Sequence, residues 1–233
     1  SSNGNTWNDI QTGDQLRLDQ SLEGINLRIL TSYTDAQGFK ETVQSKVVTI
    51  RNEQDSAPTT FAEYGSLTIN HNWKKIELTG TYDNAVVIAS DPTFFGGDPA
   101  TVRLRNIDSN SFEIRLQEPN NKDGNHTYET ISFLVVEEGS WKLQDGTMIS
   151  AGSKSTNKLS SSEHESVSFE TDFTSLPALF TQVQTYKGSD WVTTRTSNIT
   201  QDAFSVVMQK EEELNQGGHV TETIGWAAID RGM

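Results

Sequence analysis

The chain of 233 residues contains no cysteine, which excludes disulfide bridges and thiolate metal sites. Basic residues are also scarce: 18 Lys and Arg stand against 32 Asp and Glu, so the formal net charge is -14 at pH 7. Nucleic-acid binding needs a basic stripe, and an anionic membrane surface repels an acidic protein. We therefore expect neither nucleic acid nor a membrane among its partners.

Long apolar runs are missing as well. The hydrophobic share is 33% and the mean hydropathy is -0.57. No stretch approaches the roughly 20 apolar residues that span a bilayer, and no signal peptide begins at Ser1, so we interpret the chain as a mature fragment. This composition suits small β domains in which each strand has one wet face.

Motifs that mark enzymes are absent too. The four His residues form no H-E-x-x-H spacing, and there is no G-x-S-x-G elbow, P-loop or dinucleotide fingerprint. We predict no catalytic residues, although a glycosidase-type carboxylate pair stays open because sequence alone does not place carboxylates in space. We predict no cofactor and no metal site. Calcium at Glu211–Glu213 is an alternative to the solvated loop that we favour there.

What the sequence does contain is one stretch present twice. Residues 124–139 read GNHTYETISFLVVEEG and residues 217–232 read GGHVTETIGWAAIDRG. The likeness continues upstream, where WKKIELTGTY (73–82) faces HESVSFETDF (164–173). The matching positions are Asp98 and Asp190, Arg103 and Arg195, Asn106 and Asn198, Phe112 and Phe204, and Gln117 and Gln209. This predicts a tandem duplication of whole domains.

Each copy offers about six short runs separated by turn residues, with no helical periodicity. The predicted fold is all-β: two tandem antiparallel six-stranded sandwiches. We place the first at 58–142 and the second at 143–233. A polar linker containing Pro58 separates them from residues 1–53.

Residues 1–51 contain alternating Ile25, Leu27 and Ile29, then a turn at 36–38, which predicts a hairpin. The string W-N-D-I, L-x-L and SYTDAQGF resembles the C-terminal half of bacterial Ig-like repeats. That resemblance implies two further strands before Trp7. A half-sandwich leaves an open edge, so we expect a homo-oligomer or strand pairing through residues 1–51.

The two copies resemble the H-type lectin domain. The resemblance is carried by V-x-F and P-A-L-F near the start of the second copy, N-I-T-x-x-x-F in its middle, and ETIGWAAID in its final strand. It implies a six-stranded sandwich that binds galactose or N-acetylgalactosamine type sugars, or a cell-surface polysaccharide, usually as a trimer. Its sites use an Asp, an Arg, an aromatic and a His near strand ends.

Candidate sugar-binding residues follow from those residue types, because carboxylates accept from paired hydroxyls and aromatic faces stack on sugar rings. The second copy offers the richer set: Tyr186, Asp190, Trp191, Arg195 and His219. The first copy offers Asp98, Arg103 and His126, with Pro99 in place of the tryptophan. We expect the second copy to bind the sugar better.

A buried ion pair is the other expectation. Val220, Glu222, Ile224 and Trp226 alternate on one face of the last predicted strand, so Glu222 points inward and His219 falls on the wet face. A buried carboxylate needs a partner, and we assign Arg195 to Glu222. Arg103 and Glu129 repeat the pair in the first copy. For Arg195 we favour this structural role over ligand binding.

The predicted function is a non-enzymatic, extracellular carbohydrate-binding or adhesion module of a larger bacterial secreted or surface protein. One alternative is a structural spacer, stalk or assembly unit that binds no sugar. Another is an accessory targeting module for an enzyme outside this chain, because a fold resemblance alone does not establish a ligand.

Overall fold

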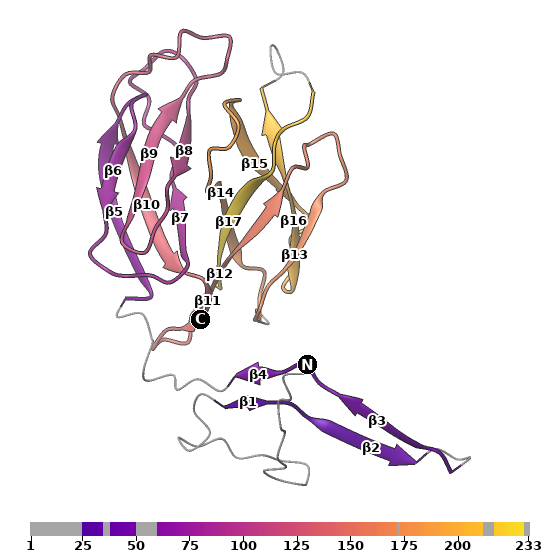
Figure 1. The fold of residues 1–233 in the computed structure, drawn as a ribbon. Coiled ribbons are helices and arrows are strands. Elements are labelled where there is room, and N and C mark those ends of the chain that lie inside the picture. Colours follow the sequence, from indigo (N-terminus) through magenta and orange to yellow (C-terminus); the bar gives the residue numbers. More distant parts are fainter. Residues whose placement is uncertain (1–24, 35–37, 50–59, 172, 212–216, 231–233) are drawn as a thin grey trace, which may run out of the picture. The chain divides into compact units, whose positions relative to one another are not determined.

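The computed structural model describes residues 25–34, 38–49, 60–171, 173–211 and 217–230, and every regular element in them is a β-strand (Figure 1). This confirms the all-β prediction. The chain divides into two compact units, Ser1–Ala57 and Pro58–Met233.

The first unit contains two small antiparallel ladders. Strand β1 (Asn26–Leu27) pairs with β4 (Val48–Thr49), and β2 (Leu30–Thr34) pairs with β3 (Lys40–Gln44). The predicted hairpin is therefore confirmed. Most of the turn predicted for this hairpin lies outside the described residues, as does Trp7. The first unit exposes these large apolar side chains to solvent: Ile25, Ile29, Leu30, Tyr33, Phe39, Val43 and Val47. Pairing of this segment with another chain stays a prediction.

The second unit begins with a sandwich of two three-stranded sheets, called here the first sandwich. One sheet has the order β5 (Ala62–Ile69), β10 (Glu129–Glu137), β7 (Ala85–Ala89). The other has the order β6 (Lys74–Glu77), β9 (Ser111–Gln117), β8 (Thr101–Arg105). All pairings are antiparallel. Alternate apolar residues of β9 fill the space between the sheets, with Phe112, Ile114 and Leu116 fully buried.

The second sandwich repeats this topology. One sheet has the order β11 (Gly139–Lys142), β12 (Met148–Thr156), β17 (Glu222–Ile229), β14 (Ala178–Val183). The other has the order β13 (Glu165–Ser168), β16 (Ala203–Lys210), β15 (Val192–Ser197). Six of these strands match those of the first sandwich. Strand β11 is a seventh strand, formed by residues that the sequence prediction, with its boundary at 142, placed in the first copy.

Two local features, a left-handed asparagine and a glycine beneath an aromatic ring, are repeated in the two sandwiches as well. Asn106 and Asn198 both adopt a left-handed backbone, with φ of 49° and 51°, a conformation that asparagine tolerates better than most residues. In each sandwich an aromatic ring of the last strand lies over a glycine of the neighbouring strand. A Cβ added at Gly65 in β5 would lie 2.8 Å from Phe133 in β10, and one added at Gly152 in β12 would lie 2.7 Å from Trp226 in β17. Gly thus makes room for a ring across each ladder.

The two sandwiches pack against each other, with β7 of the first beside β14 and β17 of the second (Figure 1). Residues of both form one buried apolar cluster: Val86, Ile88, Val136, Ala151 and Ala227. The Gln184 side chain reaches the edge of β7, where it accepts from Val87 N at 2.8 Å and donates to Val87 O at 2.7 Å. The backbone N–H and C=O of Val87 at the edge of β7 are therefore satisfied by a side chain of the other sandwich.

Candidate functional site

In each sandwich a buried glutamate at the start of the last strand holds a loop of the neighbouring strand, the loop after β7 in the first and the loop after β14 in the second. Glu222 accepts from Lys187 N at 2.9 Å, Gly188 N at 2.9 Å and the Thr185 hydroxyl. Glu129 accepts from Phe95 N at 2.8 Å, Gly96 N at 2.6 Å and the Thr93 hydroxyl at 2.6 Å. The prediction that Glu222 points inward is confirmed, since its side chain is 0% exposed.

These hydrogen bonds decide the charge of both glutamates. Burial alone raises the pKa of Glu222. Hydrogen bonds from His219, Thr185 and the backbone of Gly188 and Lys187 outweigh that effect and lower its pKa to about 2. The pKa of Glu129 is lowered by the same balance, with donors from Thr93 and the loop backbone acting against burial. Both loops therefore close around an ionised carboxylate at neutral pH.

The histidine before each last strand lies between two carboxylates. His219 Nε2 lies 3.3 Å from Glu222 Oε1, and its Nδ1 lies 3.5 Å from Asp190 Oδ2. The predicted wet-face position of His219 is wrong, because its side chain is only 1% exposed. Val220, predicted for the core, is 50% exposed. The reason is that β17 begins at Glu222, so strand alternation does not extend back to these residues.

His126 has the same arrangement in the first sandwich. Its Nδ1 lies 2.9 Å from Glu118 Oε1 and its Nε2 lies 3.4 Å from Glu129 Oε1. A glycine packs on the ring in both sandwiches: a Cβ added at Gly96 or Gly188 would lie 2.7 Å or 2.5 Å from the histidine Cε1. His126 and His219 are thus built into their loops.

The predicted arginine–glutamate pairs are wrong in both copies. Arg103 lies 3.8 Å from Glu222 of the other sandwich, measured from Nη2 to Oε1, and not beside Glu129. Arg195 is exposed and donates to Gln209 at 2.9 Å. Both arginines lie on the outer face of their sheet, because the residues beside Arg103 in β8, Val102 and Leu104, fill the core.

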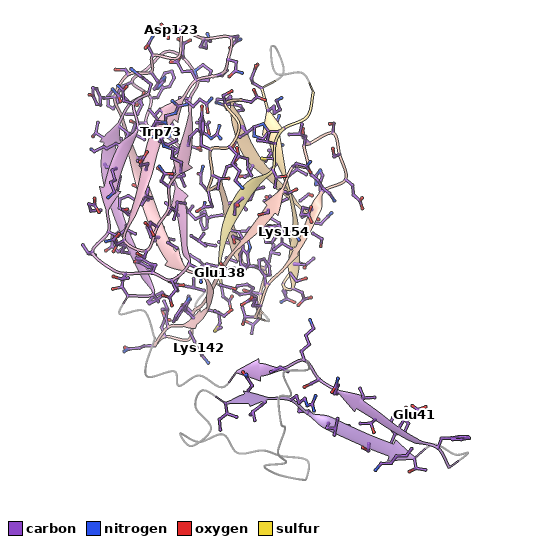
Figure 2. All side chains as sticks on the ribbon, viewed as in Figure 1. Glu41, Trp73, Asp123, Glu138, Lys142 and Lys154 are labelled. Atoms are coloured by element: carbon purple, nitrogen blue, oxygen red, sulfur yellow. The ribbon has the colours of Figure 1, made fainter. Side chains whose placement is uncertain are left out.

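The loop 185–191 of the second sandwich docks on the outer face of the first. Tyr186 packs edge-on against Trp73, with ring centroids 5.3 Å apart. The guanidinium carbons of Arg103 and Arg115 lie 4.7 Å and 4.8 Å from the centroid of the Tyr186 ring, and Arg115 donates to the Tyr186 hydroxyl at 2.7 Å. Trp73, labelled in Figure 2, comes from the segment before β6 of the first sandwich.

Backbone carbonyls of the same loop complete the contact. Asp190 O accepts from Arg103 Nη1 at 2.8 Å, and Ser189 O accepts from Gln117 Nε2 at 2.8 Å. Arg103 also donates to Gln117 Oε1 at 2.7 Å. Burial lowers the pKa of Arg103 to about 10, and Glu222 acts in the opposite direction. Arg103 therefore stays charged at neutral pH although its side chain is 0% exposed.

The predicted sugar residues of the second copy are therefore brought together in part. The Asp190 carboxylate binds Lys210 at 2.8 Å and lies near His219. The hydrogen bond from Lys210, with a further contribution from His219, lowers the pKa of Asp190. Trp191 is half-buried. Tyr186 is committed to the first sandwich, and Arg195 lies apart from this group on the outer face of β15.

The equivalent loop of the first sandwich, residues 93–99, is open. Phe94 occupies the position of Tyr186 and is 88% exposed, and Phe95 is 78% exposed. Asp98 pairs with Lys122 at 2.7 Å. A shallow cavity of about 240 Å³ lies beside Phe94, lined in part by Asp98 and His126.

A second cavity of about 430 Å³ lies between the sandwiches and is lined in part by Asp83, Asp108 and Glu138. None of the described residues that line it is aromatic, so it offers no stacking surface for a sugar. Among the described residues no group of His, Asp and Glu side chains is placed to hold a metal ion. In that same part of the chain, no helix has the length and apolar character needed to cross a membrane.

Trp73, Arg115 and Gln184 are interface residues that the sequence prediction missed. A signal for the first two exists in the duplication itself. The positions equivalent to Trp73, Arg115 and Tyr186 hold His164, Val207 and Phe94, so the copies differ where one copy binds the other. Arg103 and Gln117 also contact the docked loop, although the second copy shares them as Arg195 and Gln209.

Over 208 residues the chain is 31% identical to Halomucin from Haloquadratum walsbyi. The match covers 82% of this chain, and the chain spans about 2% of the length of Halomucin. No family model matches the chain, and no solved structure matches it. The resemblance to H-type lectins therefore stays a prediction.

Proposed function

We propose that residues 58–233 are a rigid two-sandwich spacer module of a much longer extracellular surface or secreted protein, without catalytic activity. The observation that carries this proposal is the docked loop 185–191, which buries Arg103 completely between the sandwiches. Domains joined only by a linker move relative to each other by default, whereas a buried polar and apolar interface holds them in one orientation.

The likeness to Halomucin supports the setting of this module. The matched part is about 2% of that protein, which fits a unit repeated or embedded in a very long chain. The name of that relative denotes a mucin, a kind of protein that acts outside the cell. The acidic surface adds solubility and does not identify a partner.

Calorimetric unfolding of the full chain tests the proposal. We expect residues 58–233 to unfold in one transition, because the sandwiches stabilise each other. Tyr186→Ala removes the docked ring and should separate the unfolding of the two sandwiches. Phe94→Ala, the matched change in the exposed loop, should leave the single transition intact. Independent unfolding of the two sandwiches in the parent would reject the rigid module.

Carbohydrate binding is a second candidate, favoured by the loop 93–99 of the first sandwich. It presents two exposed aromatic rings beside the Asp98 carboxylate and a shallow cavity. Exposed rings stack on the C–H faces of sugars, and carboxylates accept from sugar hydroxyls. This reverses the expected ranking of the copies, because Tyr186 in the second copy is covered by Trp73.

Titration calorimetry with galactose and N-acetylgalactosamine, after a glycan array, tests this candidate. We expect Phe94→Ala to abolish binding and Trp191→Ala to leave it unchanged. Binding that depends on Trp191 and not on Phe94 would return the site to the second copy. An array without any bound glycan would reject the candidate and leave the spacer proposal untouched.

A further inference from the structure

The interface between the sandwiches joins two different surfaces, so it leaves one of each unused. The second sandwich contributes its docking loop, residues 185–191, and the first contributes its receiving face, the outer face around Arg103 and Gln117. Each sandwich has both parts. The docking loop of the first sandwich, 93–99, and the receiving face of the second, around Arg195 and Gln209, are not used in this interface.

The unused loop already has the docking shape. Glu129 binds the backbone of Phe95 and Gly96 as Glu222 binds that of Lys187 and Gly188. Phe94 consequently projects from the position that Tyr186 holds in the docked loop, and it is 88% exposed. An exposed aromatic on a loop held by buried hydrogen bonds is a preorganised anchor.

The unused face is also preformed. Arg195 Nη1 donates to Gln209 Oε1 at 2.9 Å, which repeats the 2.7 Å contact between Arg103 and Gln117. The difference lies in what covers them. Arg103 is 0% exposed beneath Tyr186, whereas Arg195 is exposed.

The differences between the copies fit this pairing. The docked Tyr186 has a hydroxyl, and Arg115 donates to it. Phe94 has no hydroxyl, and the position of Arg115 in the second sandwich holds Val207, the register partner of Arg195 on the same face, which is 0% exposed. The Phe94 ring would therefore lie over the Arg195 guanidinium, as the Tyr186 ring lies 4.7 Å from that of Arg103. Because phenylalanine has no hydroxyl, it needs no hydrogen-bond donor in the place of Arg115.

We propose that a second copy of this chain inserts its loop 93–99 onto the Arg195 and Gln209 face, so that chains associate head to tail. The inference rests on the proposed spacer function and names its partner. A contact between two different surfaces does not pair off symmetrically, so a growing series of chains keeps one free loop at one end and one free face at the other. The expected product is an open series of chains that lengthens with concentration.

Complementation between two variants of the full chain tests this arrangement by sedimentation velocity. Phe94→Glu removes the loop anchor, and Arg195→Glu places a carboxylate where the ring must lie. Each variant alone should lose association by about tenfold or more, the usual effect of losing a central aromatic or arginine anchor. An equal mixture should form 1:1 dimers and nothing larger, because one variant keeps a good face and the other a good loop. Salt of about 0.5 M screens the repulsion between chains of net charge -14.

Two variants outside the proposed contact serve as controls. Tyr64→Glu changes an aromatic that is 87% exposed, and Lys142→Glu reverses an exposed charge. Both should associate like the parent. A parent that stays monomeric at every concentration overturns the proposal, as does a mixture of the two variants that stays monomeric. A single unfolding transition in that monomeric parent would still support the spacer function, so the two proposals fail separately.

Discussion

Arg103 and Glu222 form an ion pair between the two sandwiches, with Nη2 and Oε1 3.8 Å apart and both side chains 0% exposed. Neither residue pairs with the partner inside its own copy that the sequence suggested. The pair lies where the docked loop 185–191 meets the outer face of β8. The contact therefore couples the loop of one domain to the stability of the other.

Arg103→Met should destabilise the chain strongly. The substitution keeps apolar volume but leaves Glu222 and the Asp190 carbonyl without their arginine, and removing one partner of a buried pair costs about 3–5 kcal/mol. Arg195→Met is the matched control on an exposed residue and should stay within about 0.5 kcal/mol of the parent. Urea unfolding followed by circular dichroism measures both. Equal effects at the two positions would contradict the burial of Arg103 in solution.

Glu222→Gln should lower the melting temperature more than Glu129→Gln. Both substitutions weaken the loop by removing a charged acceptor of two backbone N–H groups. Glu222 also faces buried Arg103, so its loss leaves a buried charge without its ion partner. Differential scanning calorimetry of the two variants gives the comparison, and a larger loss for Glu129→Gln would reverse the interpretation.

Acid should destabilise the folded chain through its low-pKa glutamates. Glu222 has a folded pKa of about 2 against an ordinary value of 4.5, so its contribution is complete above pH 4.5 and is lost as the pH falls through about 2. The urea midpoint should therefore decline between pH 5 and pH 2. Glu222→Gln should flatten that decline, since the titrating group is gone. A slope that is the same in parent and variant would show that other carboxylates account for it.

Gly188→Ala and Gly96→Ala should each destabilise the sandwich that contains the glycine. The added Cβ would lie 2.5 Å or 2.7 Å from a histidine ring that is itself held between two carboxylates, so the ring has no free direction in which to move. Overpacking of this kind costs about 1–3 kcal/mol. Gly97→Ala is the control, because nothing lies within 4 Å of its Cβ position. Thermal melts that leave Gly188→Ala unchanged would mean that the loop relaxes away from His219.

Much of each sandwich could be read from the sequence. The duplication aligned Phe112 with Phe204, and both lie in the core of their sandwich, since alternate residues of β9 and β16 face inward. The duplication located Asn106 and Asn198, which share a left-handed backbone. Buried Glu222 followed from the parity of β17. Prediction failed at His219, because the strand begins three residues later and alternation says nothing of residues before it.

The sequence by itself determined the all-β class, the two repeated sandwiches and the inward direction of Glu222, because those depend on local periodicity and on residues common to both copies. Tertiary structure alone decided which surfaces meet. The sequence analysis paired Arg103 with Glu129 of its own copy and did not reveal that the second sandwich covers Arg103, since covering depends on how two finished domains pack. That packing buries Tyr186 and leaves its equivalent Phe94 exposed, and so gives equivalent loops of two similar domains different roles.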